Sequence, residues 1–327
     1  MLRYLASRLV TTLIVTVGAI ALLLSLTLII PGDPATILLG PRATPELVAA
    51  LTQRMGLDLP LHLRLVHFFG DLLRGDLGED ILSGRPVAGL VLAALPNTVM
   101  LAVSAIGLAV LIGVPLGCYA ATHPGSFGDQ VAAFISVGFI STPSFVIAIF
   151  LLLIFSVSLH WLPVMGAGDA GDPLDQLQHL VLPSLALAAG WIGYIARLIR
   201  SSLLEVLGEP FIRTSRAYGI AERAIVYKYA LKLACIPTLA VLGVGVGELL
   251  GGAVFAEIIF NRPGLGSLIY KSILDRNYPV VQGSIFIVVL LFVLTNLLVD
   301  LSYAWLDPRT RDSISSSFAP WRQRART

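Results

Sequence analysis

The segment from Gly264 to Ser272, Gly-Leu-Gly-Ser-Leu-Ile-Tyr-Lys-Ser, is the part of this sequence that comes nearest to a catalytic motif. Its glycines, lysine and serine follow the order of a phosphate-binding loop. Such a loop needs a glycine directly before the lysine, because a side chain there blocks the path of the backbone around the phosphates. Tyr270 occupies that place, so the segment is not predicted to bind ATP.

The other residue types that perform catalysis are not arranged for it. There is no Gly-x-Ser-x-Gly motif, and His62 and His67 lack the spacing of a zinc-binding His-Glu-x-x-His helix. Cys118 and Cys235 are too few for a cysteine-rich metal site, and both fall near expected cytoplasmic ends of membrane spans, where a disulfide is not expected. The sequence therefore predicts no catalytic residue, no metal site and no cofactor bound by this chain itself.

One carboxylate, Glu248, lies deep in an apolar segment. A carboxylate that faces lipid costs about 2.5–3.5 kcal/mol, so lipid exposure is the least favoured of three interpretations. The others are a buried acid paired with a neighbouring subunit, and a pore-lining group that meets a cationic part of a substrate. Small residues around it favour close packing or a water-filled path, and we expect the pore: Gly243, Gly245, Gly247, Gly251 and Gly252.

A basic loop separates two apolar segments between Glu205 and Pro237. It contains or adjoins seven basic residues: Arg197, Arg200, Arg213, Arg216, Arg223, Lys228 and Lys232. Positive charge between two membrane spans marks a cytoplasmic loop. Pro210 suits the first turn of a helix and Gly219 the turn that ends one, so a short helix is expected over 210–219. Its expected shared face is Phe211, Ile212, Ser215 and Tyr218. Such a helix lies on anionic lipid or docks onto a cytoplasmic partner.

The composition indicates that the elements carrying these residues are membrane-spanning helices. Of 327 residues 56% are apolar and 13% charged, and the mean hydropathy is +0.86. Several uncharged runs exceed about 18 residues, the length that crosses hydrocarbon. Six spans are expected: Leu9–Ile30, a run from residues 96–98 to about Ala121, Val131–Leu159 with an interruption at Pro143, Leu180–Ala196, Ala234–Ile259 and Val280–Val299. The predicted fold is all-α and polytopic, with both termini cytoplasmic.

The spans divide the chain into four expected parts. Residues 1–30 form the first span, and 31–93 form an extracytoplasmic segment with short helices near 44–56 and 60–73. Residues 94–306 form a five-helix core that contains the cytoplasmic loop 205–233. Residues 307–327 form a basic cytoplasmic tail.

Three groups of motifs stand in order along the chain. The outer segment contains Pro31-Gly-Asp-Pro34, Met55-Gly-Leu-Asp-Leu-Pro60, Leu73-Arg-Gly-Asp-Leu-Gly78 and Arg85-Pro-Val87. The loop reads Arg213-Thr-Ser-Arg-Ala-Tyr-Gly219 and is followed by Ile236-Pro237. The last group runs from Glu257-Ile-Ile-Phe-Asn-Arg-Pro-Gly-Leu-Gly266 to Asp275, Tyr278-Pro279 and Gln282-Gly283.

Together these motifs resemble the permease subunits of type I ABC importers, in the dipeptide/oligopeptide/nickel family. The loop resembles their "EAA" coupling loop. The departures are Asp80 for a frequent Ser, Ser215 for Ala, Tyr218 for a common Lys, Ile258 for Thr, and Asn277, which separates Arg276 from Tyr278.

The resemblance implies a subunit of the bacterial inner membrane that forms half of a pore. Its implied partners are a second permease in a heterodimer, two ATPase subunits that bind ATP and Mg²⁺, an extracytoplasmic binding protein, and membrane lipid, but no nucleic acid. The expected cargo is peptides; nickel chelates and glycosides remain alternatives, and a secondary transporter or a channel is less favoured. Residues expected to couple to the ATPase are Glu209, Phe211, Arg213, Thr214, Ser215, Arg216, Tyr218 and Gly219. Pore or gate candidates are Glu248, Glu257, Pro263 and Gly264.

Overall fold

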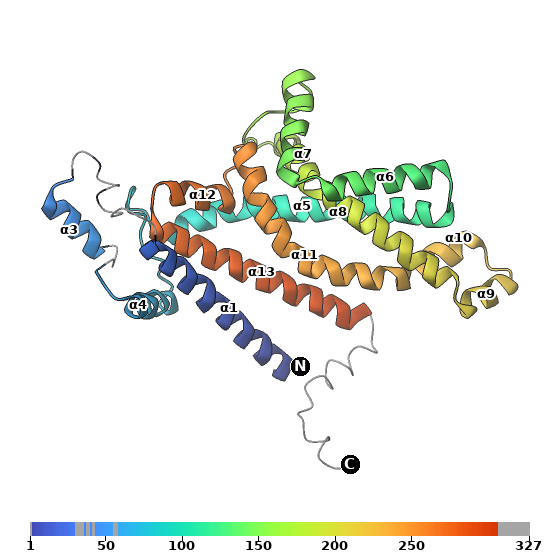
Figure 1. Cartoon of the computed structure of the whole chain (residues 1–327), viewed down its shortest axis with the longest axis horizontal. Helices are drawn as coiled ribbons and strands as arrows, with labels where there is room; N and C mark the ends of the chain where they lie inside the picture. The colour runs from blue at the N-terminus through green and yellow to red at the C-terminus, as the bar shows by residue number, and fades with distance from the viewer. Residues whose placement is uncertain (1, 30–35, 37–39, 41–42, 55–57, 307–327) are drawn as a thin grey trace, which may run out of the picture. The chain divides into compact units, whose positions relative to one another are not determined.

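The computed structural model describes residues 2–29, 36, 40, 43–54 and 58–306. These residues form helices joined by turns, and their only β pairing is an isolated bridge between Glu79 and Pro86. The all-α prediction is confirmed. Figure 1 shows the helices, which are α1 (Leu2–Ile29), α3 (Pro45–Arg54), α4 (Leu61–Leu73), α5 (Val87–Thr122), α6 (Phe127–Ser141), α7 (Ser144–Leu151), η2 (Leu152–Ser158), α8 (Pro173–Leu207), α9 (Pro210–Ala217), α10 (Glu222–Ala224), η3 (Ile225–Ala230), α11 (Leu231–Ile259), α12 (Leu265–Leu274) and α13 (Tyr278–Leu306).

Four helical stretches within the described residues are long and apolar enough to cross a membrane: Val87–Thr122, Pro173–Leu207, Glu222–Gly243 and Tyr278–Leu298. The pair Phe127–Ser141 and Ser144–Ser158 makes a fifth span if its broken helix is counted as one. The remaining expected span lies in α1, where Leu13–Ser25 is an apolar helical stretch within the described residues. The described residues thus support a multi-pass subunit with four to five candidate spans.

Two helices extend well beyond their predicted spans. α5 begins at Val87 and includes Pro96, whereas the span was expected to follow that proline. α8 has 35 residues and not the 17 of Leu180–Ala196. At 1.5 Å per residue α8 is about 52 Å long, more than the ~30 Å of hydrocarbon. Hydropathy detects only the part of a helix that suits lipid, so it misses polar turns that continue beyond the apolar run.

The expected interruption of the third span is confirmed. α6 ends at Ser141 and α7 begins at Ser144, so the helix breaks at Thr142 and Pro143. The Thr142 hydroxyl donates a 2.8 Å hydrogen bond to the carbonyl oxygen of Gly138. Side-chain hydroxyl groups bond backbone carbonyls in this way where a proline interrupts a membrane helix.

The outer segment contains both expected helices. The Thr44 hydroxyl accepts a 3.3 Å hydrogen bond from the Leu47 amide at the start of α3. Gly75, with φ +79°, follows the end of α4. The motif Pro31-Gly-Asp-Pro34, Gly56 at the expected end of the first short helix, and the basic tail at 307–327 fall outside the described residues.

The chain divides into two compact units. The first comprises residues 1–103, 148–183 and 250–293, and the second comprises 104–147, 184–249 and 294–327. The core of the first unit centres on Val87, Val91, Ala94, Leu265 and Val280.

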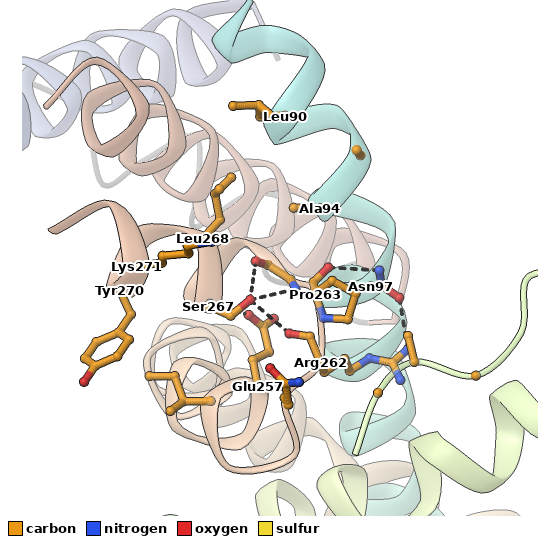
Figure 2. A pocket seen from close by; sticks show the side chains of 17 residues that line it. Leu90, Ala94, Asn97, Glu257, Arg262, Pro263, Ser267, Leu268, Tyr270 and Lys271 are labelled. Carbon is orange, nitrogen blue, oxygen red and sulfur yellow. Dashed lines mark hydrogen bonds between the residues drawn. The ribbon is translucent and has the colours of Figure 1, made fainter. Parts of the chain in front are cut away.

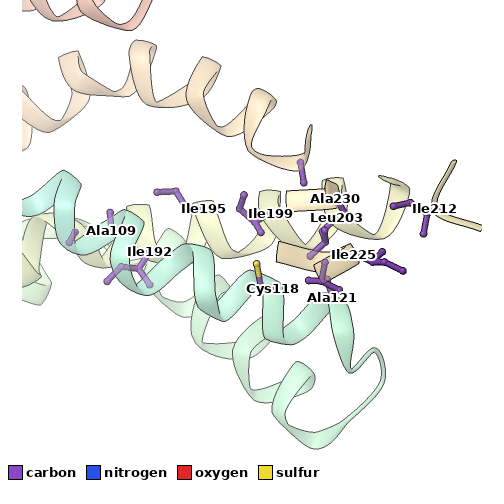
Figure 3. Packing of buried hydrophobic residues seen from close by; sticks show 13 residues of the cluster. Ala109, Cys118, Ala121, Ile192, Ile195, Ile199, Leu203, Ile212, Ile225 and Ala230 are labelled. Atoms are coloured by element: carbon purple, nitrogen blue, oxygen red, sulfur yellow. The ribbon is translucent and has the colours of Figure 1, made fainter. Parts of the chain in front are cut away.

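In the second unit, residues of α5, α8, η3 and α11 form one buried apolar cluster (Figure 3). Two glycines of α5 allow α8 to approach closely. A Cβ at Gly117 would lie 2.6 Å from the Ala196 carbonyl oxygen, and one at Gly113 would lie 2.9 Å from Ile195 Cβ. Small residues at helix contacts give membrane helices this close packing.

Candidate functional site

The predicted loop helix is present as α9. Pro210 occupies its first turn, Glu209 precedes it in an extended conformation, and Gly219 has φ +75° directly after the helical turn. That backbone conformation is open to glycine at little cost and strained for most other residues. The sequence therefore placed both ends of α9 correctly.

Only one residue of the expected shared face is buried. Ile212 is fully buried and belongs to the apolar cluster of the second unit, where Figure 3 shows it with Leu203 and Ile225. Phe211 and Tyr218 are 41% and 83% exposed. The helix is thus anchored through Ile212 and presents its aromatic residues outward.

The hydroxyl groups of α9 donate hydrogen bonds to carbonyl oxygens of the same helix. Thr214 donates to the Pro210 carbonyl oxygen at 3.1 Å, and Ser215 donates to the Phe211 carbonyl oxygen at 2.9 Å. Arg213 is exposed beside them. The surface that α9 offers to a partner is therefore mainly aromatic and cationic.

Arg216 has a partner that the sequence did not reveal. Its Nη2 and Nε donate to the two carboxylate oxygens of Glu222 at 2.6 and 3.1 Å. The pair joins α9 to the start of α10 across the turn at Gly219. Glu222 lies beyond the end of α9, so helical spacing gives no signal for this contact.

A second ion pair fixes the start of α6 onto α8. Arg200 donates to both carboxylate oxygens of Asp129, at 2.7 and 2.8 Å. Asp129 also accepts a 2.9 Å hydrogen bond from the Gly125 amide. Arg200 was counted only as one of the basic residues of the loop, whereas the structure gives it a fixed position.

The first unit contains a cavity of about 840 Å³ at the end of α11. Its walls come from α5, from residues 166–168, from the turn after α11 and from α12. Figure 2 shows Glu257, Arg262 and Pro263 lying together with Asn97 and Ser267. Three of the four predicted gate residues, Glu257, Pro263 and Gly264, line this one cavity.

Glu257 is fully buried and well bonded. Its carboxylate accepts from the Thr98 hydroxyl at 2.5 Å and from the Ser267 amide at 2.9 Å. The same Thr98 hydroxyl accepts from the Leu265 amide at 2.8 Å. Glu257 and Thr98 together bind amides at the amino end of α12, where unpaired N–H groups attract negative charge. In this geometry Glu257 positions α12.

Pro263 and Gly264 shape the same turn. The Asn97 amide nitrogen donates to the Pro263 carbonyl oxygen at 3.0 Å. Gly264 packs directly against the Glu257 carboxylate, and a Cβ there would overlap it. Glycine is therefore required at 264 by space, since its φ of −111° suits any residue.

Arg262 was overlooked as a candidate, although it stands in the quoted motif between Glu257 and Gly266. It is 1% exposed, and its Nη2 donates to Asn97 Oδ1 at 3.3 Å. Nε and Nη1 have no hydrogen-bond partner among the described residues. Burial lowers the pKa of Arg262 and the nearby Glu257 carboxylate partly offsets this, but a guanidinium stays charged at neutral pH.

Asp80 and Asn277, which both depart from the family motifs, are hydrogen-bonded to each other in the first unit. The buried Asn277 side chain donates to the Asp80 carboxylate, which also accepts from the Leu82 amide and the Ser83 hydroxyl. Burial raises the pKa of Asp80, but the hydrogen bonds together outweigh it and hold the pKa below its usual value. This contact fastens the outer segment to the turn between α12 and α13.

Glu248 belongs to the second unit, on α11, and is exposed. Among its neighbouring glycines, Gly245 lies against the Trp191 indole, where a Cβ would overlap the ring. Close packing of α8 on α11 thus accounts for one of these glycines.

Within the described residues no group of three His, Cys, Asp or Glu side chains is arranged to hold a metal.

Comparison with known proteins places the chain in one family. The family model "Binding-protein-dependent transport system inner membrane component" matches residues 113–312, and the model of its N-terminal region matches residues 1–102.

Curated relatives match over nearly their full length. A probable peptide ABC transporter permease of Sinorhizobium fredii is 39% identical over 310 residues, 94% of this chain and 99% of that protein. The glutathione transport system permease GsiC of Salmonella typhimurium is 39% identical over 312 residues, 95% and 99%. The dipeptide transport system permease DppB of Alkalihalophilus pseudofirmus is 37% identical over 332 residues, 95% and 100%.

A solved structure supports the same fold. It is an inward-facing form of the MetNI methionine ABC transporter, with a TM-score of 0.54 and 21% identity over 67% of this chain and 97% of that chain. The chain therefore belongs to the binding-protein-dependent transport system inner membrane component family, as a non-catalytic, multi-pass inner-membrane permease subunit of an ABC transporter.

Proposed function

We propose that this permease imports peptides, including the tripeptide glutathione, and supplies half of the pore. The observation that carries the proposal is identity of 37–39% along almost the entire length of permeases named for peptides, dipeptides and glutathione. Nickel chelates and glycosides are the competing cargoes. The expected partners are a second permease, two ATPase subunits that hold ATP and Mg²⁺, and an extracytoplasmic binding protein.

We further propose that α9 couples the pore to an ATPase subunit. The contact residues would be Glu209, Phe211, Arg213, Thr214, Ser215, Arg216, Tyr218 and Gly219. Support comes from the outward aromatic residues and from the burial of Ile212, which joins α9 to α5, α8 and η3 through one packed cluster. Close-packed interiors transmit displacement. Movement of the ATPase would therefore shift the spans through Ile212.

Reconstitution tests the proposed cargo. The importer is assembled in proteoliposomes with its two ATPase subunits, second permease and binding protein, and uptake of labelled dipeptides, glutathione, a glycoside and a nickel chelate is compared. Uptake of peptides that needs both ATP and the binding protein is expected. Transport without the ATPase subunits would instead favour a secondary transporter or channel, and preference for the glycoside or nickel chelate would refute the peptide assignment.

The proposed topology has six spans, with α1 as the first and both termini cytoplasmic. In a Cys118→Ala, Cys235→Ala background, single cysteines at Ala43 and Ala170 should react with an impermeant thiol reagent added to sealed cells. A cysteine at Ser215 should react only after the membrane is opened. Labelling of position 215 in intact cells would show that the orientation is reversed.

We propose that Glu248 faces the pore and attracts cationic groups of the cargo, such as a peptide amino group. An exposed carboxylate on an apolar span needs water or a partner subunit, because lipid exposure costs about 2.5–3.5 kcal/mol. Glu248→Gln should therefore assemble normally but import peptides with a free amino group more slowly, whereas N-acetylated peptides are unaffected. Failure to assemble would favour pairing with a neighbouring subunit, and unchanged uptake of both peptides would remove Glu248 from the mechanism.

A further inference from the structure

The cavity at the end of α11 combines a suitable size with a buried cation whose hydrogen bonds are incomplete. Its volume of about 840 Å³ lies within the range of roughly 300–1,000 Å³ that small-molecule sites occupy. Apolar walls, including Leu90 and Ala94, surround a few polar groups near the turn after α11. This combination is typical of a binding site.

The charges that line the cavity leave an excess of positive charge. The charged lining residues are Glu257, Arg262 and Lys271. Glu257 is occupied by the Thr98 hydroxyl and the Ser267 amide, at 2.5 and 2.9 Å. Arg262 and Lys271 therefore outnumber the single carboxylate of Glu257, which already accepts hydrogen bonds from two donors. This balance of charge favours an anionic ligand.

The backbone of Arg262 is held in place by hydrogen bonds, but its guanidinium has unused donors. Its amide donates to the Glu257 carbonyl oxygen at 2.8 Å, and its carbonyl oxygen accepts from the Ser267 hydroxyl at 2.9 Å. Among the described residues its guanidinium has one bond, a 3.3 Å contact with Asn97, and Nε and Nη1 are buried without a partner. Unpaired buried donors, especially on a charged group, are costly, so the site gains from a ligand that supplies acceptors.

We propose that Arg262 binds the C-terminal carboxylate of a peptide during its passage through this cavity. Guanidinium groups bind carboxylates through charge-assisted hydrogen bonds, and two nitrogens of Arg262 are unused. Lys271, on the cavity wall, would add attraction for the same charge. The inference rests on the proposed peptide cargo and names the part of that cargo which the permease recognises.

The test compares each peptide as a free acid and as its C-terminal amide, in the complete importer. The preference of the binding protein cancels when the acid-to-amide uptake ratio of a variant is divided by that of the wild type. In Arg262→Gln this ratio should fall roughly tenfold or more, as expected for loss of a hydrogen bond to a charged group. Arg262→Lys keeps the charge and should give an intermediate ratio. Arg85→Gln removes an exposed cation from the same unit, outside the cavity, and should leave the ratio unchanged.

Equal loss of acid and amide uptake in Arg262→Gln, or an unchanged ratio, would overturn the inference. If Arg262→Gln does not co-purify with its partners, Arg262→Lys becomes the deciding variant. A wild-type acid-to-amide uptake ratio in Arg262→Lys would also overturn the inference. Should the wild-type importer carry neither form of any peptide, the proposed peptide function itself fails. Peptide uptake with an unchanged ratio in the variants refutes only the role of Arg262.

Discussion

Gly219→Val should strongly reduce peptide uptake while the subunit remains inserted and assembled with the second permease. Gly219 has φ +75°, and a β-branched residue there costs about 1–3 kcal/mol. Apart from residue 219 and its two chain neighbours, no described heavy atom lies within 4 Å of the position of an added Cβ, so the effect comes from backbone strain and not from a clash. Strain relieved by rotating α9 would misplace the docking surface, and a cost of that size corresponds to roughly a 5- to 150-fold loss of coupling. Uptake and substrate-stimulated ATP hydrolysis are the measurements.

Gly219→Asn is the matched control, because asparagine tolerates the left-handed conformation better than other residues with a side chain. It should retain most uptake, although it adds a larger polar group than glycine at the same place. If the asparagine variant is as inactive as the valine variant, contact of residue 219 with a partner, and not its backbone conformation, controls coupling.

Arg216→Glu should uncouple transport from ATP hydrolysis with little effect on the thermal stability of the subunit. The pair with Glu222 is exposed, with side chains 44% and 57% accessible, and such pairs contribute about 0–1 kcal/mol to stability. Any large functional loss must then come from the position of α9 or from its contact with the ATPase. Reversal of the charge replaces attraction across the turn by repulsion, so uptake should fall by roughly tenfold or more.

The double variant Arg216→Glu, Glu222→Arg separates these two explanations. It restores an ion pair across the turn but leaves a negative charge on α9. Recovery of uptake would assign Arg216 to holding the turn, whereas continued loss would assign it to the ATPase contact. Normal uptake in the single Arg216→Glu variant would refute both roles. Arg213→Glu tests the neighbouring cation, which is exposed.

Local features were predictable because the chemistry that fixes them is local. Pro210 and Gly219 defined α9, and Pro143 marked the break in the third span. Each depends on a dihedral preference or on a hydrogen bond between residues a few positions apart. The apolar runs likewise identified helices that suit lipid, but not how far each helix continues beyond it.

The sequence by itself determined a multi-pass helical subunit, its basic loop helix and the motifs of its family. Only the tertiary structure decided which polar side chains meet. Thr98 and Glu257 are 159 positions apart, Asp129 and Arg200 are 71 apart, and Asp80 and Asn277 are 197 apart. No periodicity links such residues, because their contact depends on how separate helices pack, and packing is set by the shapes of many side chains together. For the same reason the sequence pointed to Glu257 as a gate residue, while the structure shows its carboxylate bonded at the start of α12 and leaves the neighbouring Arg262 with unused donors.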